Sequence, residues 1–216
     1  MQSRLWILAL GVGAAMAQPP VIVQPGAPGT ASKVVTAAAV EIKPHDLQPA
    51  DIKFMQGMIH HHQQAVEMTA LMPTHTHNKP LLELGKRISI SQTDEIRFMQ
   101  QWLSDRDLAV PMSQGHMDHS HMGAGGMMDM ASMPPMPGML TAEQMKALAA
   151  AKGAKFDYLF LTGMIQHHRG ALTMVVDLFN EPATGQDAQL FDFATDVDNT
   201  QTAEIKIMQG LLKGKK

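Results

Sequence analysis

An internal repeat constrains the fold of this chain more than any other feature. Residues 54–68 (FMQGMIHHHQQAVEM) match residues 160–174 (FLTGMIQHHRGALTM), and residues 92–100 (QTDEIRFMQ) match residues 201–209 (QTAEIKIMQ). All these segments have the apolar spacing of amphipathic helices. Each copy is therefore a helix, a loop and a second helix, and such a hairpin cannot bury its apolar face alone. Two hairpins that cover each other predict an all-α four-helix bundle.

The first residues have the pattern of a secretory signal peptide. Arg4 precedes an apolar run, and the small-x-small motif AMA at 15–17 predicts a signal over residues 1–17 and a mature chain from Gln18. The run is short for a bilayer span, and no later segment is long and apolar enough. We expect an exported protein, periplasmic or extracytoplasmic, without a membrane span after cleavage. An uncleaved membrane anchor is the alternative.

Composition divides the remaining chain into four segments. Prolines without periodicity predict a disordered tether over residues 18–45, followed by the first hairpin over 46–110. A Met/His-rich linker, expected to be mobile, spans residues 111–140, and the second hairpin spans 141–212. Thr141 and the acidic and amide residues after it predict a small helix at the start of this last segment.

Methionine and histidine are unusually abundant. The chain has 20 Met, 11 His and no Cys, so a metal site must use nitrogen, oxygen or thioether ligands and no disulfide can form. The formal net charge of -3 gives no reason to expect a nucleic-acid partner.

A helical projection of the first repeated helix turns two of its three adjacent histidines inward. With Met58 at the centre of the apolar face, His61 and His62 lie on that side and His60 points away. The repeat agrees, because Gln166 replaces His60 whereas both inward histidines recur. The predicted inward positions are Phe54, Met58, His61, His62, Ala65, Met68, Thr69 and Met72, with Met164, His167, His168 and Met174 as repeat counterparts.

The second repeated helix carries a carboxylate on its apolar face. With Met99 at the centre, Glu95 lies inward, whereas Asp94 and Arg97 lie outside. Burying an unpaired carboxylate costs on the order of several kcal/mol, so Glu95 needs a partner, and the inward histidines are candidates. The second hairpin repeats this arrangement with Gln201, Glu204 and Met208.

Two interpretations of these inward groups stay open: a buried polar network that fixes the bundle register, or a metal site. Thioether and imidazole ligands favour copper, especially Cu(I), with zinc less favoured. A di-iron site of the ferritin type uses four carboxylates. Each hairpin offers one inward Glu, so the bundle interior supplies too few carboxylates for such an iron site.

The linker contains a second group of soft metal ligands. Its segment 116–122 can wrap a soft cation through His116, Met117, His119, His121 and Met122, and six further methionines follow before residue 140. The alternatives are a plain flexible linker and a Met-rich surface that binds a peptide.

The segments GMIHHHQQAVEM and GMIQHHRGALTM, the paired QTxEI helices and the central TAEQM stretch resemble the domain of unknown function 305 family over residues 46–212. The resemblance implies a ferritin-like bundle and copper binding, because the family includes CopM-type periplasmic copper-binding proteins. His60, where many members have another residue, is expected not to be a ligand. The positions carried over are Met58, His61, His62, Met68, Met164, His167, His168 and Met174.

We therefore predict an exported copper-binding protein that buffers, sequesters or transfers copper, with copper ions and another copper-handling protein as partners. The alternatives are a metal-dependent oxidase of the ferritin type, which would consume oxygen, and a metal-free helical interaction module, which would not retain copper. The oligomeric state stays open. The predicted ligands are Met58, His61, His62, Met68, Glu95, Met99, Met164, His167, His168, Met174, Glu204, Met208, His116, Met117, His119, His121 and Met122.

Overall fold

The computed structural model describes residues 21–24, 33–36, 46–111 and 136–214, which belong to two units, Met1–Pro44 and His45–Lys216. In the first unit, strand β1 (Val21–Gln24) pairs antiparallel with β2 (Lys33–Thr36). The β-branched residues of both segments favour extended pairing. The sequence predicts a tether without regular structure here, so this strand pair departs from the prediction. The predicted signal segment lies outside the described residues.

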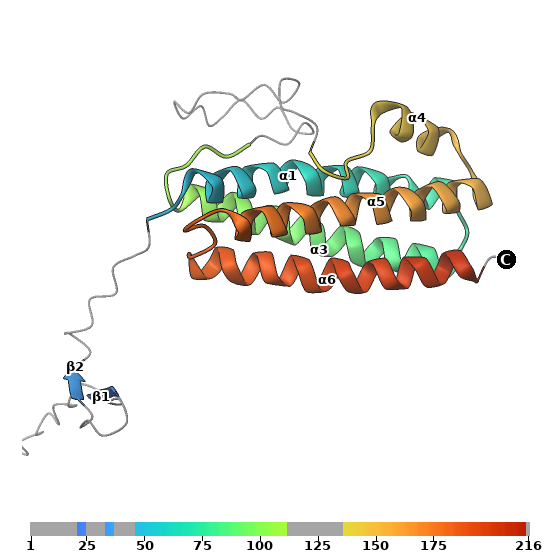
Figure 1. The fold of residues 1–216 in the computed structure, drawn as a ribbon. Coiled ribbons are helices and arrows are strands. Elements are labelled where there is room, and N and C mark those ends of the chain that lie inside the picture. The colour runs from blue at the N-terminus through green and yellow to red at the C-terminus, as the bar shows by residue number, and fades with distance from the viewer. Residues whose placement is uncertain (1–20, 25–32, 37–45, 112–135, 215–216) are drawn as a thin grey trace, which may run out of the picture. The chain divides into compact units, whose positions relative to one another are not determined.

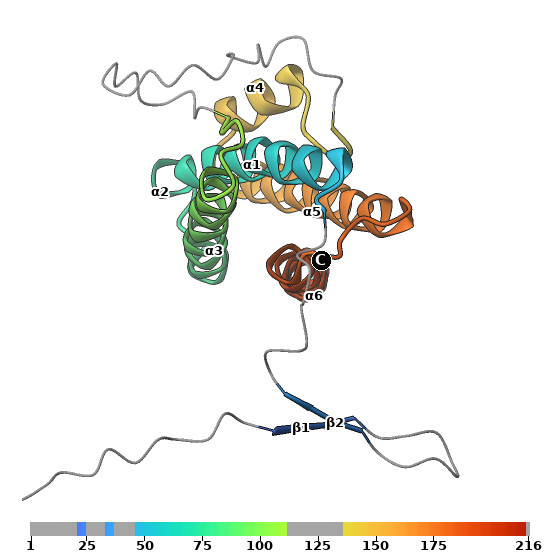
Figure 2. The ribbon, with the colours of Figure 1, turned by 90° about the vertical axis from the view of Figure 1, so that its left-hand side faces the viewer.

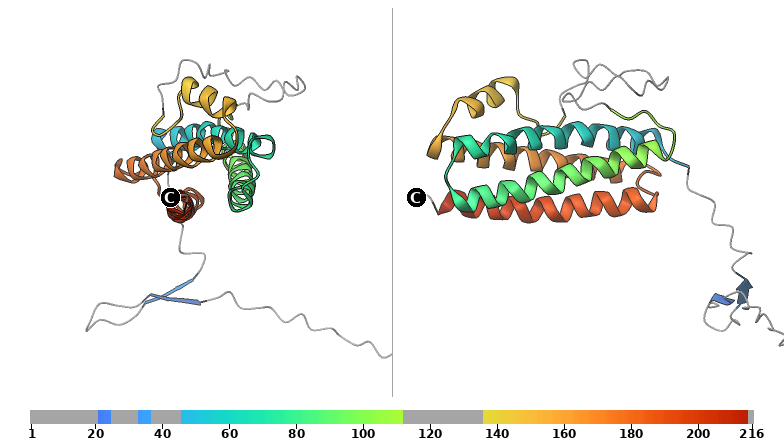
Figure 3. Two further views of the ribbon diagram at one scale, coloured as in Figure 1. Left: turned by 90° about the vertical axis from the view of Figure 1, so that its right-hand side faces the viewer. Right: turned by 180° about the vertical axis from the view of Figure 1, so that it is seen from behind.

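The second unit is the predicted bundle of two repeated hairpins. Helix α1 packs on α3, α5 packs on α6, and α1 packs on α5, so each hairpin covers the other. Figure 2 shows α1 and α5 in one layer and α3 and α6 in the other, and Figures 1 and 3 show the four long helices along a common axis. None of the described helices is long and apolar enough to cross a bilayer. The helices are α1 (Pro49–Ala70), α2 (Met72–His75), α3 (Lys79–Ser104), α4 (Ala142–Ala150), α5 (Gly153–Asn180) and α6 (Ala188–Lys213).

Short-range signals set where the helices begin. The Thr141 side chain accepts a hydrogen bond from the backbone N–H of Gln144, which confirms the predicted small helix as α4. Asp187 caps α6 by accepting from the backbone N–H of Leu190 at 3.0 Å. Asp187 also accepts from the indole of Trp102 at 3.0 Å, so this cap joins the end of α3 to the start of α6.

The core consists of two apolar clusters with polar residues between them. One cluster occupies the end of the bundle that contains Met68, Ile88, Met164 and Ile205. The other occupies the opposite end and is built from Phe54, Met58, Met99, Trp102, Ala171 and Val197, among others. In all four long helices the sequence passes from one cluster to the other through polar residues, so the polar residues form a layer across the middle of the bundle.

Residues 136–140, here called the strap, lie on α1 and α5. Gln64 binds Leu140 twice, by accepting from its N–H at 2.7 Å and donating to its carbonyl at 3.0 Å. Gly138 has a φ of +74°, and a Cβ on Gly170 would lie 1.9 Å from the carbonyl oxygen of Pro137, so the approach requires glycine at both positions. The sequence predicts an unpacked linker up to residue 140, whereas the strap is packed.

The helical projection turns His60 away from the bundle core, and that face of α1 is covered rather than open to solvent. His60 is only 6% exposed. Gln56, one turn before it, donates to the carbonyl of Ala109 at 2.8 Å, and Gln64, one turn after it, holds Leu140 of the strap. Chain segments from either side of the linker therefore cross this face of α1, and a helical projection contains no information about such returning segments.

Candidate metal centre

The polar layer takes two residues from each long helix. All four of its histidines are 0% exposed, and its two glutamines are 2% exposed. Because the residues come from repeated segments, each hairpin supplies the same set of two His, one Gln and one Glu. The layer consists of His61 and His62 on α1, Gln92 and Glu95 on α3, His167 and His168 on α5, and Gln201 and Glu204 on α6.

Two histidines pair with the inward carboxylates, as the sequence predicts. The Nε2 atom of His62 lies 2.5 Å from Oε2 of Glu95, and Nε2 of His168 lies 2.6 Å from Oε2 of Glu204. Burial raises the pKa of Glu95, but the hydrogen bonds from His62 and Ser91 outweigh it and leave the pKa below its usual value. Glu95 is therefore an ionised acceptor, and the side chains of both carboxylates remain partly exposed at 23% and 12%.

The other two histidines meet where α1 and α5 touch. The rings of His61 and His167 have centroids 3.8 Å apart. The Nε2 atom of His167 lies 2.7 Å from the carbonyl oxygen of His61, whereas Nε2 of His61 lies 3.0 Å from the carbonyl oxygen of Pro137 in the strap. The repeat would direct Nε2 of His61 at the carbonyl oxygen of His167, so the strap breaks the symmetry of the two halves.

These partners fix the tautomer of the imidazoles. A carbonyl or carboxylate oxygen only accepts, so Nε2 must carry the proton and donate it, and Nδ1 of a neutral ring then holds a lone pair. The Nδ1 atoms of all four layer histidines are buried without a hydrogen-bond partner. Burial lowers the pKa of His61 to about 3, and burial also lowers the pKa of His167 well below its ordinary value. Both rings are therefore neutral at pH 7, with a free lone pair.

The two glutamines of the layer also have buried side-chain atoms without hydrogen-bond partners. The amide nitrogen and oxygen of both Gln92 and Gln201 are buried without a hydrogen-bond partner. Buried polar groups normally have partners, and a group left alone costs about 1–3 kcal/mol. The layer therefore has side-chain nitrogen and oxygen atoms that could bind a further polar group.

The predicted methionine ligands fall into two groups. Four are fully buried and lie within one helical turn of a layer residue, where side chains three or four apart are neighbours: Met58, Met99, Met164 and Met208. The other two reach across to the opposite hairpin: the methyl carbon of Met68 lies 3.3 Å from the Cβ position of Gly163, and that of Met174 lies 3.5 Å from the Cβ position of Gly57. Met68 and Met174 are thus directed at the repeated glycines of the opposite hairpin.

Within the described ranges, no three His, Asp, Glu or Cys side chains converge closely enough to hold a metal ion. Binding of a metal by the polar layer would therefore have to combine imidazole with thioether ligands. The predicted linker ligands His116, Met117, His119, His121 and Met122 lie outside the described residues.

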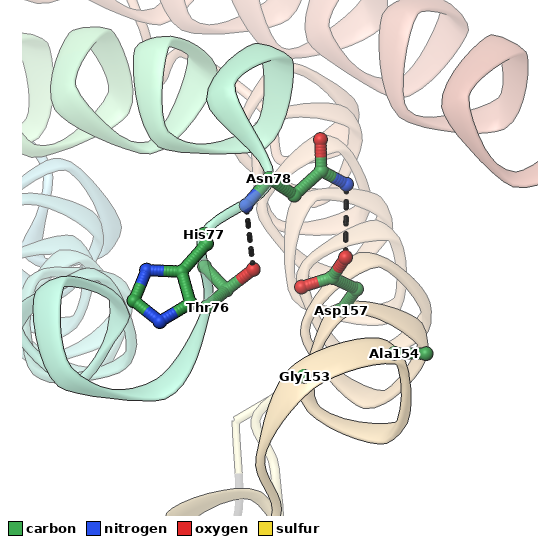
Figure 4. A pocket seen from close by; sticks show the side chains of 6 residues that line it. All are labelled: Thr76, His77, Asn78, Gly153, Ala154 and Asp157. Atoms are coloured by element: carbon green, nitrogen blue, oxygen red, sulfur yellow. Dashed lines mark hydrogen bonds between the residues drawn. The ribbon is translucent and has the colours of Figure 1, made fainter.

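The polar side chains that line a surface pocket between the hairpins hold the two hairpins together. Its walls include Thr76, His77, Asn78 and Asp157, and the Asn78 side chain donates to Asp157 at 2.8 Å (Figure 4). Asp157 occupies the repeat position of Asp51, whose carboxylate is fully buried and accepts from the backbone N–H of Gly185 at 2.8 Å. The first helix of each hairpin therefore holds the loop of the other. The apolar pattern does not predict the roles of Asp51 and Asp157, although alignment of the two repeats places them at equivalent positions.

The comparisons with known proteins agree with this architecture. The family model of the domain of unknown function 305 matches residues 51–212, and no curated protein sequence matches the chain. A solved DUF305 protein from Streptomyces coelicolor is 30% identical, with a TM-score of 0.60 over 76% of this chain and 93% of its own. CopM in its Cu(II)-bound form is 27% identical, with a TM-score of 0.56 over 77% of this chain and 97% of its own. CopM in its Cu(I)-bound form is 25% identical, with a TM-score of 0.56 over 77% and 98%.

Proposed function

Because the chain belongs to the domain of unknown function 305 family, we propose that it is an exported copper-binding protein that buffers, sequesters or transfers copper. Its similarity to CopM, which has been solved with copper in both oxidation states, supports this assignment. The proposal concerns binding, with copper as the cargo.

The observation that carries the proposal is the state of the four layer histidines. Each has its Nε2 within hydrogen-bond distance of an oxygen acceptor and a buried Nδ1 without a hydrogen-bond partner. Metal-bound histidines usually have this arrangement, in which the second ring nitrogen donates to a carboxylate or carbonyl that orients the ring. For His62 and His168 the orienting acceptor is a glutamate, so these two residues match the carboxylate–histidine–metal arrangement.

Ligand softness favours copper among the common metals. Imidazole nitrogen suits several transition metals, but thioether sulfur selects Cu(I), and fully buried methionines flank both halves of the layer. Zinc could use the imidazoles and carboxylates but gains little from thioether. Two carboxylates, Glu95 and Glu204, are fewer than a di-iron site of the ferritin type requires, and both are engaged by histidine.

The remaining parts of the proposal rest on the sequence. The Met/His-rich linker would supply further soft ligands through segment 116–122. The signal pattern over residues 1–17 supports export, and so does the Streptomyces coelicolor relative, which is described as a candidate secreted protein.

Metal analysis with paired variants tests the proposal. The full chain is equilibrated with Cu(I), Cu(II) or Zn(II), passed over a desalting column and analysed for metal content and thermal stability. Replacing His62 and His168 with Gln keeps an N–H donor for the glutamates but removes the Nδ1 lone pairs. The matched control is His60→Gln, since the repeat itself has Gln166 at that position.

We expect copper to raise the Tm of the full chain and of the control, because a ligand that binds only the folded state stabilises it. The double variant should keep its metal-free Tm to within a few degrees and lose the copper-induced rise. Loss of the metal-free Tm with an unchanged copper-induced rise would show that these histidines are structural.

A further inference from the structure

Two methionine side chains from distant parts of the sequence meet at Gly57 on α1. The Cβ position of Gly57 lies 3.4 Å from the sulfur of Met136, in the strap, and 3.5 Å from the methyl carbon of Met174, on α5. The glycine leaves open the space that both side chains border. Both methionines are only partly buried, whereas the layer histidines are fully buried, so this point is nearer to solvent than the layer.

His61 adjoins the same point. It lies one turn after Gly57, and helical side chains lean toward the N-terminus of their helix, so its ring lies over the turn that Gly57 begins. Its Nε2 atom bonds to the carbonyl oxygen of Pro137, which directly follows Met136. Two methionine side chains at Gly57 and the His61 ring one turn away, with its unpartnered Nδ1, are thus contributed by α1, α5 and the strap.

The second hairpin provides an internal comparison. Gly163 is the repeat counterpart of Gly57, and its Cβ position lies 3.3 Å from the methyl carbon of Met68 and 3.0 Å from Leu140 of the strap. The strap therefore places one side chain over each glycine, a thioether over Gly57 and a hydrocarbon over Gly163. Of these two glycines, Gly57 is contacted by two methionine side chains and Gly163 by one.

We propose that Met136, Met174 and His61 form a second soft-cation site, for Cu(I) or Ag(I), at the edge of the bundle. This inference rests on the proposed copper-binding function and adds the site through which a cation reaches the buried histidines. Two thioethers and an imidazole are the soft ligands that Cu(I) prefers. Because Met136 follows directly on the Met/His-rich linker and His61 belongs to the polar layer, the site connects two sets of ligands.

Silver titration of the full chain, labelled with ¹³C in the methionine methyl groups, tests the site. Silver is a stable soft monocation, so no reductant is needed. Single Met→Leu variants assign the signals and conserve side-chain volume, a change that usually costs less than about 1.5 kcal/mol. Met145→Leu is the matched control, since Met145 lies on α4 and belongs to neither proposed site.

We expect the Met136 and Met174 methyl signals to shift at the same ratio of silver to protein. Met136→Leu should abolish the silver-induced shift of the Met174 methyl signal, and Met174→Leu should abolish that of Met136. Met145→Leu should leave both shifts intact. In Cu(I) competition with a chromogenic chelator, the Met136→Leu, Met174→Leu double variant should lose roughly 10-fold or more in affinity at this site, since even outer-shell partners of a metal are worth 10–100-fold.

Independent responses of the two methyl groups, or no response at Met174, would overturn this site. If copper still raised the Tm through His62 and His168, the proposed function would stand without it. A chain that bound neither silver nor copper would refute both.

Discussion

Acidification should destabilise the metal-free protein through its buried histidines. His61 is fully buried, and burial lowers its pKa from 6.5 to about 3. Below pH 6.5 the unfolded chain binds a proton at this residue and the folded chain does not, so the free energy of unfolding falls as the pH falls from 6.5 toward 3. At and above neutral pH both states are neutral at this ring, and the residue adds no pH dependence.

The size of the loss in unfolding free energy follows from how far the pH falls below 6.5. Each pH unit of this fall changes the free energy of unfolding by about 1.4 kcal/mol. Between pH 7 and pH 5, His61 alone therefore removes about 2 kcal/mol. The pKa of His167 is lowered by burial in the same direction and increases the loss. The lowered pKa of Glu95 acts at lower pH, because its stabilising charge is lost only below about pH 4.5.

Urea unfolding of the chelator-treated protein, followed by circular dichroism at pH 7, 6 and 5, measures this loss. His61→Gln should reduce the difference in unfolding free energy between pH 7 and 5 by about 2 kcal/mol, whatever its effect at pH 7. His77→Gln removes an exposed imidazole and should leave the difference unchanged. An unfolding free energy independent of pH in the wild type, or an equal slope in the His61 variant, would refute the assignment of a neutral buried ring.

Three further predictions concern other parts of the molecule. Asp51→Ala should lower the unfolding free energy by roughly 1–3 kcal/mol, because the backbone N–H of Gly185 loses its buried acceptor; an unchanged urea midpoint would contradict this. Deleting residues 112–135 should remove most of the Cu(I) capacity that persists at pH 5, where thioether does not titrate, and leave the circular dichroism nearly unchanged; equal capacity in both proteins would make the linker a spacer. Mass spectrometry of protein from the native host's envelope should find a chain that begins at Gln18, and an intact Met1 would contradict cleavage.

The repeat made the fold predictable. Because matched segments recur with helical spacing, the hairpin unit, its duplication and the inward faces all follow from the sequence. The pairing of His62 with Glu95 also follows, since an inward carboxylate needs a partner and the adjacent helix offers one. The pairing of His62 with Glu95 and the ring contact of His61 with His167 confirm the helical phase deduced from the apolar positions.

The strap was not predictable by the same means. Its contacts with α1 and α5 join residues far apart in the sequence, and a projection of one helix describes only that helix. Prolines, glycines and methionines at 136–140 continue the composition of the linker, so composition indicates no boundary there. The burial of His60, the bond from His61 to Pro137 and the approach of Met136 to Gly57 all depend on this segment.

The central claim is that the four layer histidines present free Nδ1 lone pairs to copper. Long-range ¹H–¹⁵N correlation of the histidine rings at pH 7 observes these atoms directly, before and after addition of Ag(I), which replaces the easily oxidised Cu(I). We predict that His62 and His168 carry the proton on Nε2 and that their Nδ1 resonances shift on silver binding. Protonated Nδ1 atoms, or Nδ1 resonances that silver leaves unchanged while it binds elsewhere, would contradict the account.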